Sequence, residues 1–166
     1  MKTELANPYP GKNCFFCGSG NVHGLHLKFY HDDERCETSA EYVPADHYAG
    51  QGDILHGGIQ MGLLDEIMGW ASFVHTGEMA VTTKMEVQFL RPLYISGQPV
   101  RLACRVTGRS GRKVHLQAEL VNAENLVCTQ AAGIYHILTP EKHAALVRAE
   151  DAPRAPHATP KQKAPA

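Results

Sequence analysis

The sequence predicts an α+β fold in which a curved antiparallel sheet of about six strands wraps around one long helix. The helix is predicted from an apolar run that follows His56-Gly57-Gly58 and covers about Gly58–Val74. The sheet is predicted from a short hairpin before this run and four long β-type runs after it. Because such a sheet leaves edges unpaired, we expect two copies to pair edge to edge as a homodimer that assembles further into a tetramer.

The segment before the helix divides into a lead-in and a hairpin. Residues 1–24 form an irregular lead-in with a turn-like knob, Cys14-Phe-Phe-Cys17-Gly18. Apolar and polar residues then alternate with period two on both sides of a polar turn, which predicts a hairpin. Its two strands are expected at residues 25–30 and 36–43, and a loop at 44–53 leads to the helix.

The runs after the helix are separated by turns rich in glycine, serine and asparagine. The strands are expected at residues 79–90, 99–107, 113–121 and 126–138. The main domain therefore covers residues 25–138, and the C-terminal part covers 139–166. A short surface helix is expected over 140–150, and the dominance of Ala, Pro and Lys in 151–166 predicts a disordered tail.

Composition excludes several classes of partner. The net charge of −1 gives no support for binding nucleic acid or a membrane surface. No apolar run reaches the roughly 20 residues that span a bilayer. The first residues lack the apolar stretch of a secretory signal, and five cysteines is an odd number. We therefore expect a cytoplasmic protein with reduced thiols.

The start of the predicted helix is the strongest candidate for a site. A helix N-terminus presents unpaired N–H groups, and glycine lets a ligand oxygen approach them without meeting a Cβ. Gly57 and Gly58 stand there, and Asp65 follows about two turns further along the helix. An anion-binding helix start with a carboxylate on the same helix favours acyl transfer. His56 has two open interpretations, as a brace for the backbone or as a proton carrier.

These residues resemble a known family, the hotdog-fold acyl-CoA thioesterases, and within it the PaaI-like branch that includes the human thioesterase superfamily members. The resemblance covers roughly residues 14–138. Its most specific parts are His56-Gly57-Gly58 with Asp65 nine positions after the histidine, and the predicted strand that ends in Phe89-Leu-Arg-Pro92. The Cys14–Gly18 knob followed by Gly24-Leu25 is similar to a feature of some uncharacterised members.

The resemblance implies roles for the residues of this motif. Gly57 would donate its N–H to the thioester carbonyl, with Gly58 close by. Asp65 would act as general base or nucleophile on a substrate held by the other subunit. The expected function is hydrolysis of an acyl-CoA thioester to free acid and CoA. No separate cofactor is implied, because CoA is part of the substrate.

The resemblance also implies polar residues beside the reacting carbonyl. Thr82, ten positions before Pro92, would help to place the water, and Thr83 is the alternative if the register slips by one. Many members carry Asn or Gln six residues before the histidine, where this chain has Gly50. Gln51 is the neighbour that could supply the missing contact.

The phosphates of CoA need cations, which a strand end and a hairpin turn provide in this sequence. The candidates are Arg91, Arg109, Arg112 and Lys113, although a solvated hairpin tip explains the turn equally well. Glu66 is interpreted as a structural or interface acid. The apolar helix residues Met61, Leu64, Met68 and Trp70 either line a tunnel for the acyl group or fill the core.

The cysteines raise the question of a metal. Cys14, Cys17, His23 and His26 have C-x2-C-x5-H-x2-H spacing, which could hold zinc. The gap between the pairs is short for a zinc finger, and glycine-rich turns accommodate cysteines without metal, so we expect no metal site. Cys36, Cys104 and Cys128 fall in strand runs and are expected to be buried packing residues.

Two other functions compete with the thioesterase. A non-catalytic acyl-CoA-binding or sensing module would use the same fold without turnover, and the presence of Asp65 argues against it. A hydratase or dehydratase is also possible on this fold, with His47 as its candidate histidine. The loop around His47 lacks the His-Phe-Pro-Gly-like sequence that such enzymes carry, which ranks this reading last.

Overall fold

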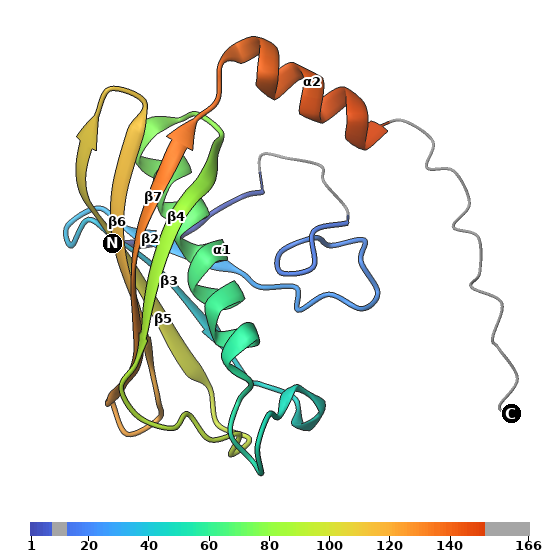
Figure 1. Cartoon of the computed structure of the whole chain (residues 1–166), viewed down its shortest axis with the longest axis vertical. Coiled ribbons are helices and arrows are strands. Elements are labelled where there is room, and N and C mark those ends of the chain that lie inside the picture. The colour runs from blue at the N-terminus through green and yellow to red at the C-terminus, as the bar shows by residue number, and fades with distance from the viewer. Residues whose placement is uncertain (8–12, 152–166) are drawn as a thin grey trace, which may run out of the picture.

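A computed structural model describes residues 1–7 and 13–151, with side chains up to Arg148. The described residues form one antiparallel sheet of seven strands, whose spatial order is β1-β2-β3-β5-β6-β7-β4. A long helix, α1, lies against one face of the sheet (Figure 1). The strands are β1 (Lys2–Glu4), β2 (Phe29–Asp32), β3 (Glu37–Tyr42), β4 (Ala80–Phe89), β5 (Val100–Ser110), β6 (Lys113–Val121) and β7 (Val127–Ile137). The helices are η1 (Asp46–Tyr48), α1 (Gly57–Thr76) and α2 (Pro140–Asp151).

This architecture confirms the predicted fold class. The four strands expected after the helix are β4, β5, β6 and β7, and α2 occupies the position of the expected surface helix. None of the helices in residues 1–7 and 13–151 is long and apolar enough to cross a membrane. The tail predicted to be disordered lies outside the described residues from position 152 onward.

Helix α1 begins and ends at residues suited to those positions. His56 is its N-cap, and the His56 ring nitrogen Nδ1 accepts a hydrogen bond from the Gly58 N–H at 2.9 Å. Gly77 ends the helix in the left-handed conformation, with φ of 69°, and its N–H bonds the Phe73 carbonyl. The helix therefore extends slightly beyond the predicted range at both ends.

The core lies between α1 and the sheet. Leu64 and Met68 of α1 are fully buried in it, as are Leu116 and Leu120 of β6. Leu64 and Met68 thus fill the core instead of lining an open tunnel. Each Å² of apolar surface that is removed from water contributes about 25 cal/mol of stability, and this burial is the main force that holds the helix on the sheet.

The sequence predicted a sheet that wraps around the helix, whereas in the single chain one flank of the helix is partly exposed. Met61 of α1 is 40% exposed, and Phe89 and Leu90 at the end of β4 are about half exposed. Strand β4 is an edge of the sheet, and among the described strands it pairs with β7 alone. An apolar helix flank and an open edge strand therefore lie on the same side of the molecule, near β4.

The N-terminal region departs from the prediction in three places. Lys2–Glu4 forms a seventh strand, β1, where an irregular lead-in was expected. The first hairpin strand begins at Phe29, because Leu25 and Leu27 donate their N–H groups to the knob at Phe15 and Phe16 instead. Cys36 is exposed in the hairpin turn with φ of 48°, so its predicted burial is wrong. Cys104 and Cys128 are buried as expected.

Candidate active site

The histidine at the helix start holds the backbone in place. The His56 N–H donates to the Tyr48 carbonyl at 2.9 Å, and the His56 carbonyl accepts from Ile59 and Gln60. Because Nδ1 accepts the Gly58 N–H, this ring nitrogen carries no proton in the capped arrangement. The geometry thus gives His56 the bracing role, one of the two roles considered for it.

Two further side chains fix the start of α1. The Gln60 amide nitrogen donates to the Leu55 carbonyl at 2.6 Å, and its oxygen accepts the Thr129 hydroxyl of β7. Both polar side chains are buried. This buried amide, bonded through both its nitrogen and its oxygen, ties the first turn of α1 to the sheet and fixes the direction of the N–H groups at the helix start.

Gly57 occupies the first helical position, where its N–H has no partner one turn earlier. Among the described residues no hydrogen bond from this N–H is formed, whereas the Gly58 N–H is taken by His56. A Cβ at Gly57 would lie 3.3 Å from Cζ of Phe89. Gly57 is therefore the free donor of the pair, and its surface is bounded by an exposed aromatic ring.

Asp65 lies at the centre of a second group of residues, formed by α1, β4 and β7. Its Oδ1 accepts the Thr82 hydroxyl at 2.6 Å and the Tyr135 hydroxyl at 2.6 Å. These distances are typical of hydroxyl donors to an ionised carboxylate. Oδ2 has no donor among the residues described, so one oxygen of the half-buried carboxylate is held and the other is free.

Tyr135 is a site residue that sequence reasoning missed. It is 2% exposed, and burial together with its bond to Asp65 raises the pKa of the phenol above its usual value. The phenol therefore stays protonated and acts as a donor. In the sequence, Tyr135 is marked only by its place among the inward-facing residues of the alternating pattern of β7. Pairing of Thr82 with Tyr135 across β4 and β7 is what brings it to the aspartate.

The structure also separates the threonine alternatives. Strand β4 is irregular between Thr82 and Lys84, so the inward and outward positions do not simply alternate there. Thr83 donates to the Ile134 carbonyl at 2.9 Å, away from Asp65. Of the two candidates, Thr82 is therefore the one in contact with the aspartate.

In the single chain, the loop before the helix supplies no side-chain amide in place of the Asn or Gln that is expected at Gly50. A Cβ at Gly50 would lie 3.3 Å from Cδ2 of His56, so the glycine packs directly on the capping ring. Gln51 is exposed in the next turn, where its backbone carbonyl accepts the Ile54 N–H at 3.1 Å. His47 is exposed, and its ring packs on the ring of Tyr48.

The predicted phosphate ligands do not form one cluster. Arg91 follows β4 and donates to the Val127 carbonyl, at the sheet end near the start of α1. Arg109, Arg112 and Lys113 lie on the β5–β6 hairpin at the other end, where Arg109 bonds Gly111 and Arg112 bonds Ile137. Lys113 is exposed in the same turn. One chain therefore cannot use all four on one phosphate.

A hollow is present elsewhere, on the sheet face opposite α1. Gln88, Gln117 and Gln130 are among its polar lining residues, and none of Gly57, Asp65 and Thr82 belongs to it. Because chemistry needs the acid and the N–H donor, this polar hollow is not the candidate active site.

One antiparallel sheet with a long helix packed on one face is the architecture of the hotdog class of folds. Residues 52–129, which include Gly57, Asp65 and Thr82, match the sequence model of the thioesterase superfamily. Over this segment the chain is similar to that superfamily, in agreement with the resemblance seen in the sequence.

Solved structures agree on the fold. A thioesterase superfamily protein is similar with a TM-score of 0.69 and 19% identity, over 80% of this chain and 68% of that chain. The E. coli PaaI protein from the phenylacetic acid degradation operon gives 0.62 and 18%, over 69% and 81%. A Streptococcus mutans protein bound to acetyl-CoA gives 0.58 and 18%, over 62% and 82%. A comparison with curated proteins finds no match.

Proposed function

We propose that this protein is an acyl-CoA thioesterase, which hydrolyses a thioester to the free acid and CoA. The observation that carries the proposal is the carboxylate of Asp65, whose Oδ1 is held by Thr82 and Tyr135 while Oδ2 is free. A fixed carboxylate with one available oxygen can deprotonate a water or attack the thioester carbonyl itself. The two routes share the same residue and stay open.

The second part of the proposed chemistry is the N–H of Gly57. Thioester hydrolysis passes through a tetrahedral oxyanion, and one well-aimed N–H can stabilise it by about 3 kcal/mol. The helix dipole adds a partial positive charge at the same place. His56 and Gln60 hold this donor in position, so little reorganisation is needed when the oxyanion forms.

The two parts are too far apart to serve one carbonyl within a single chain. Gly57 and Asp65 are eight residues apart on α1, which corresponds to about 12 Å along the helix axis. A carbonyl carbon that touches the acid cannot place its oxygen within hydrogen-bond distance of that N–H. The proposed site therefore needs the two parts from different chains.

The edge strand β4 offers a way to combine them. Thr82 and Phe89 mark the Asp65 end and the Gly57 end of this strand. If two β4 strands pair antiparallel about a two-fold axis near their middle, the Thr82 end of one meets the Phe89 end of the other. A homodimer of this kind would contain two complete sites, and further assembly to a tetramer remains a prediction.

The same pairing would bring the divided cations together. Arg91 lies beyond the Phe89 end of β4, and the hairpin with Arg112 and Lys113 lies beyond the Thr82 end. Antiparallel pairing would place Arg91 of one copy toward the hairpin of the other. A CoA phosphate bound there would be close to the proposed site, and the acetyl-CoA bound to the Streptococcus mutans protein supports this class of ligand.

The proposal is tested with aromatic, short-chain and long-chain acyl-CoAs, by measuring release of free thiol. We expect turnover of at least one acyl class by the wild type and its loss in Asp65→Ala. Thiol release by Asp65→Ala at the wild-type rate would contradict the mechanism. Tight acyl-CoA binding without turnover by the wild type would favour the sensing module instead.

A mixing experiment tests the shared site. Gly57→Ala should fold, because Phe89 is 52% exposed and can move away from the added methyl, and it should be inactive because that methyl blocks the N–H. When Gly57→Ala and Asp65→Ala are combined in equal amounts, half of the dimers carry both. In a two-fold dimer each of these has one intact site, so about one quarter of the wild-type rate should return. Two inactive variants that stay inactive when mixed would place the site within one chain.

A further inference from the structure

The cysteine knob, residues 14–18, is a hydrogen-bonded turn. The Gly18 N–H donates to the Cys14 carbonyl at 3.0 Å and closes the turn that contains both cysteines. Leu25 and Leu27 donate to the carbonyls of Phe15 and Phe16 at 2.8 and 2.9 Å. The knob is thereby joined to the chain that enters β2, and its position does not depend on the side chains alone.

The knob packs on α1 through a close approach at Gly62. A Cβ at Gly62 would lie 2.2 Å from Cζ of Phe16, which no real Cβ can tolerate. Only glycine lets the Phe16 ring lie directly on the helix at this place. The same contact brings the two cysteines over the next turn of α1, where Glu66 stands.

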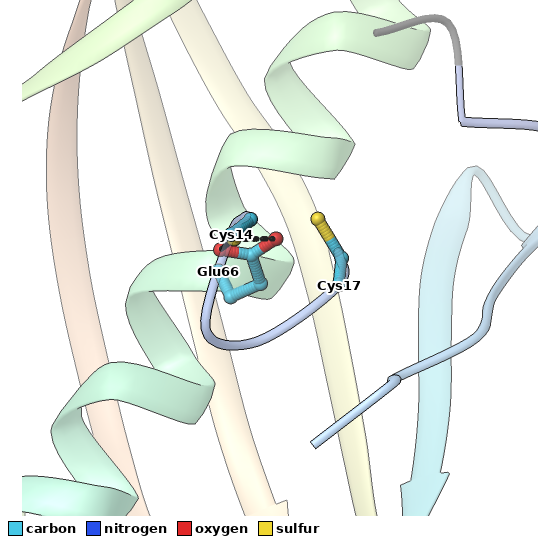
Figure 2. A group of neighbouring side chains, drawn as sticks. All are labelled: Cys14, Cys17 and Glu66. Carbon is cyan, nitrogen blue, oxygen red and sulfur yellow. Dashed lines mark hydrogen bonds between the residues drawn. The ribbon is translucent and has the colours of Figure 1, made fainter. Parts of the chain in front are cut away.

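Cys14, Cys17 and Glu66 form a compact group of metal-binding atoms. Figure 2 shows the two cysteines on one turn of the chain and Glu66 beside them on the helix. The Cys14 sulfur lies 3.8 and 3.7 Å from the two carboxylate oxygens of Glu66. One ligand atom from each of the three residues lies within 4.8 Å of the others.

Cys14, Cys17 and Glu66 are all partly buried. In the described residues no lysine or arginine pairs with Glu66. A partly buried carboxylate beside two thiols, with no cation of the described residues paired to it, is suited to a bound cation.

We propose that Cys14, Cys17 and Glu66 bind a zinc ion that fastens the cysteine knob to α1. With Zn–S of about 2.3 Å and Zn–O of about 2.0 Å, tetrahedral ligands are separated by about 3.8 Å between sulfurs and about 3.5 Å between sulfur and oxygen. The observed separations need only small movements to reach these values. Two thiolates select zinc over calcium or magnesium, which prefer oxygen ligands alone.

The glutamate is already oriented for this role. The Trp70 indole N–H donates to Oε1 of Glu66 at 3.1 Å, and the indole is stacked on Phe29 with centroids 4.9 Å apart. A donor behind a metal-binding carboxylate fixes its direction and tunes its basicity. Three protein ligands leave the fourth zinc position for a water molecule.

This proposal changes the ligand set considered from the sequence. The expectation of no metal rested on the short gap between the cysteines and the histidines of the C-x2-C-x5-H-x2-H pattern. His23 and His26 are exposed and are not part of the group. Glu66, which is distant in the sequence, takes their place.

The test uses the full-length chain, reduced and stripped of metal with a chelator, and then titrated with Zn²⁺ and with Co²⁺. We expect one ion per chain and, for Co²⁺, the charge-transfer absorption of thiolate ligands. Cys14→Ser and Cys17→Ser should abolish both signals. Trp70→Phe keeps the stacking on Phe29 and removes only the donor, so it should bind about 10- to 100-fold more weakly. Because Trp70→Phe keeps all three ligands, it also tests metal binding if the loss of a ligand unfolds the knob.

Matched controls exclude other thiols and imidazoles. Cys36→Ser removes an exposed cysteine, and His23→Gln combined with His26→Asn removes the alternative ligands; the asparagine suits the positive φ of 51° at His26. Both controls should keep the metal at wild-type affinity. A reduced wild type that binds neither ion overturns the proposal. So does loss of zinc in the histidine variant with retention in Glu66→Ala.

Discussion

Asp65 and Glu66 are neighbours on α1, yet they face different surroundings. The Asp65 carboxylate points toward the sheet and accepts two hydroxyls, from Thr82 on β4 and Tyr135 on β7. The Glu66 carboxylate points toward the N-terminal knob and lies beside the sulfur of Cys14 and the indole N–H of Trp70. A step of one residue turns a side chain by about 100° around a helix, which is enough to separate the two acids.

The neighbouring side chains, and not the type of acid, therefore determine what chemistry each carboxylate can perform. Hydroxyl donors hold one oxygen of Asp65 and leave the other for a substrate or water. Glu66 is surrounded by thiols and an indole, and burial raises its pKa to about 7. The first arrangement fits acid–base or nucleophilic chemistry, and the second fits a soft metal ion.

The different roles of Asp65 and Glu66 are tested most directly by neutralising each acid in turn. Asp65→Asn keeps the size of the side chain and removes its charge, and should reduce thiol release by about 10²- to 10⁴-fold. Glu66→Gln should leave thiol release close to the wild type, because Glu66 does not touch the proposed site. The steady-state rate of each variant on the same acyl-CoA measures the contrast.

The reverse pattern would exchange the roles of the two acids. Retained activity in Asp65→Asn with loss in Glu66→Gln would move the chemistry to the knob side of α1. A folded state must be verified for each variant by circular dichroism. The zinc titration of Glu66→Gln is independent of this assay, so failure of the metal proposal and failure of the thioesterase proposal give different results.

A smaller effect on turnover is expected from the two threonines of β4, which test how Asp65 is held. Thr82→Val removes a hydroxyl that donates to the carboxylate, a bond worth about 1.5–3 kcal/mol. We expect about a tenfold loss of turnover if half or more of this energy is used in the transition state. Thr83→Val, the matched control, removes a bond to the Ile134 carbonyl and should change turnover little. Equal losses in both variants would point to a general disturbance of the edge strand.

Much of the fold could be predicted from the sequence because its signals are local. The apolar run after His56-Gly57-Gly58 and the turns between the later strands mark elements without reference to the rest of the chain. Asp65 and Thr82 were recognised through a family pattern, and the structure places them 2.6 Å apart at their oxygens. Their individual roles in catalysis stay predictions.

What could not be predicted depends on contacts between distant segments. Tyr135 reaches Asp65 only because β7 lies beside β4, and the register of that pairing has no local signal. Glu66 meets Cys14 across 52 positions of sequence, through a close approach that Gly62 permits. A spacing rule that searches near the cysteines finds His23 and His26 instead. Likewise, Cys36 was assigned to a strand and lies in an exposed turn.

The smallest effect concerns Tyr135, the buried donor to Asp65. Burial, followed by the bond to Asp65, raises the pKa of this phenol above the value of about 10 in an unfolded chain. Above about pH 10 the unfolded chain loses a proton that the folded chain keeps, so the stabilising contribution is complete below that pH and is lost as the pH rises. Tyr135→Phe should therefore unfold with a shallower dependence on alkaline pH than the wild type. Tyr42, whose pKa burial raises to about 12, is present in both proteins and cancels in the comparison. Urea unfolding at several pH values between neutral and alkaline measures the two slopes, and identical slopes would mean that the Tyr135 phenol is not held in its protonated form beside the aspartate.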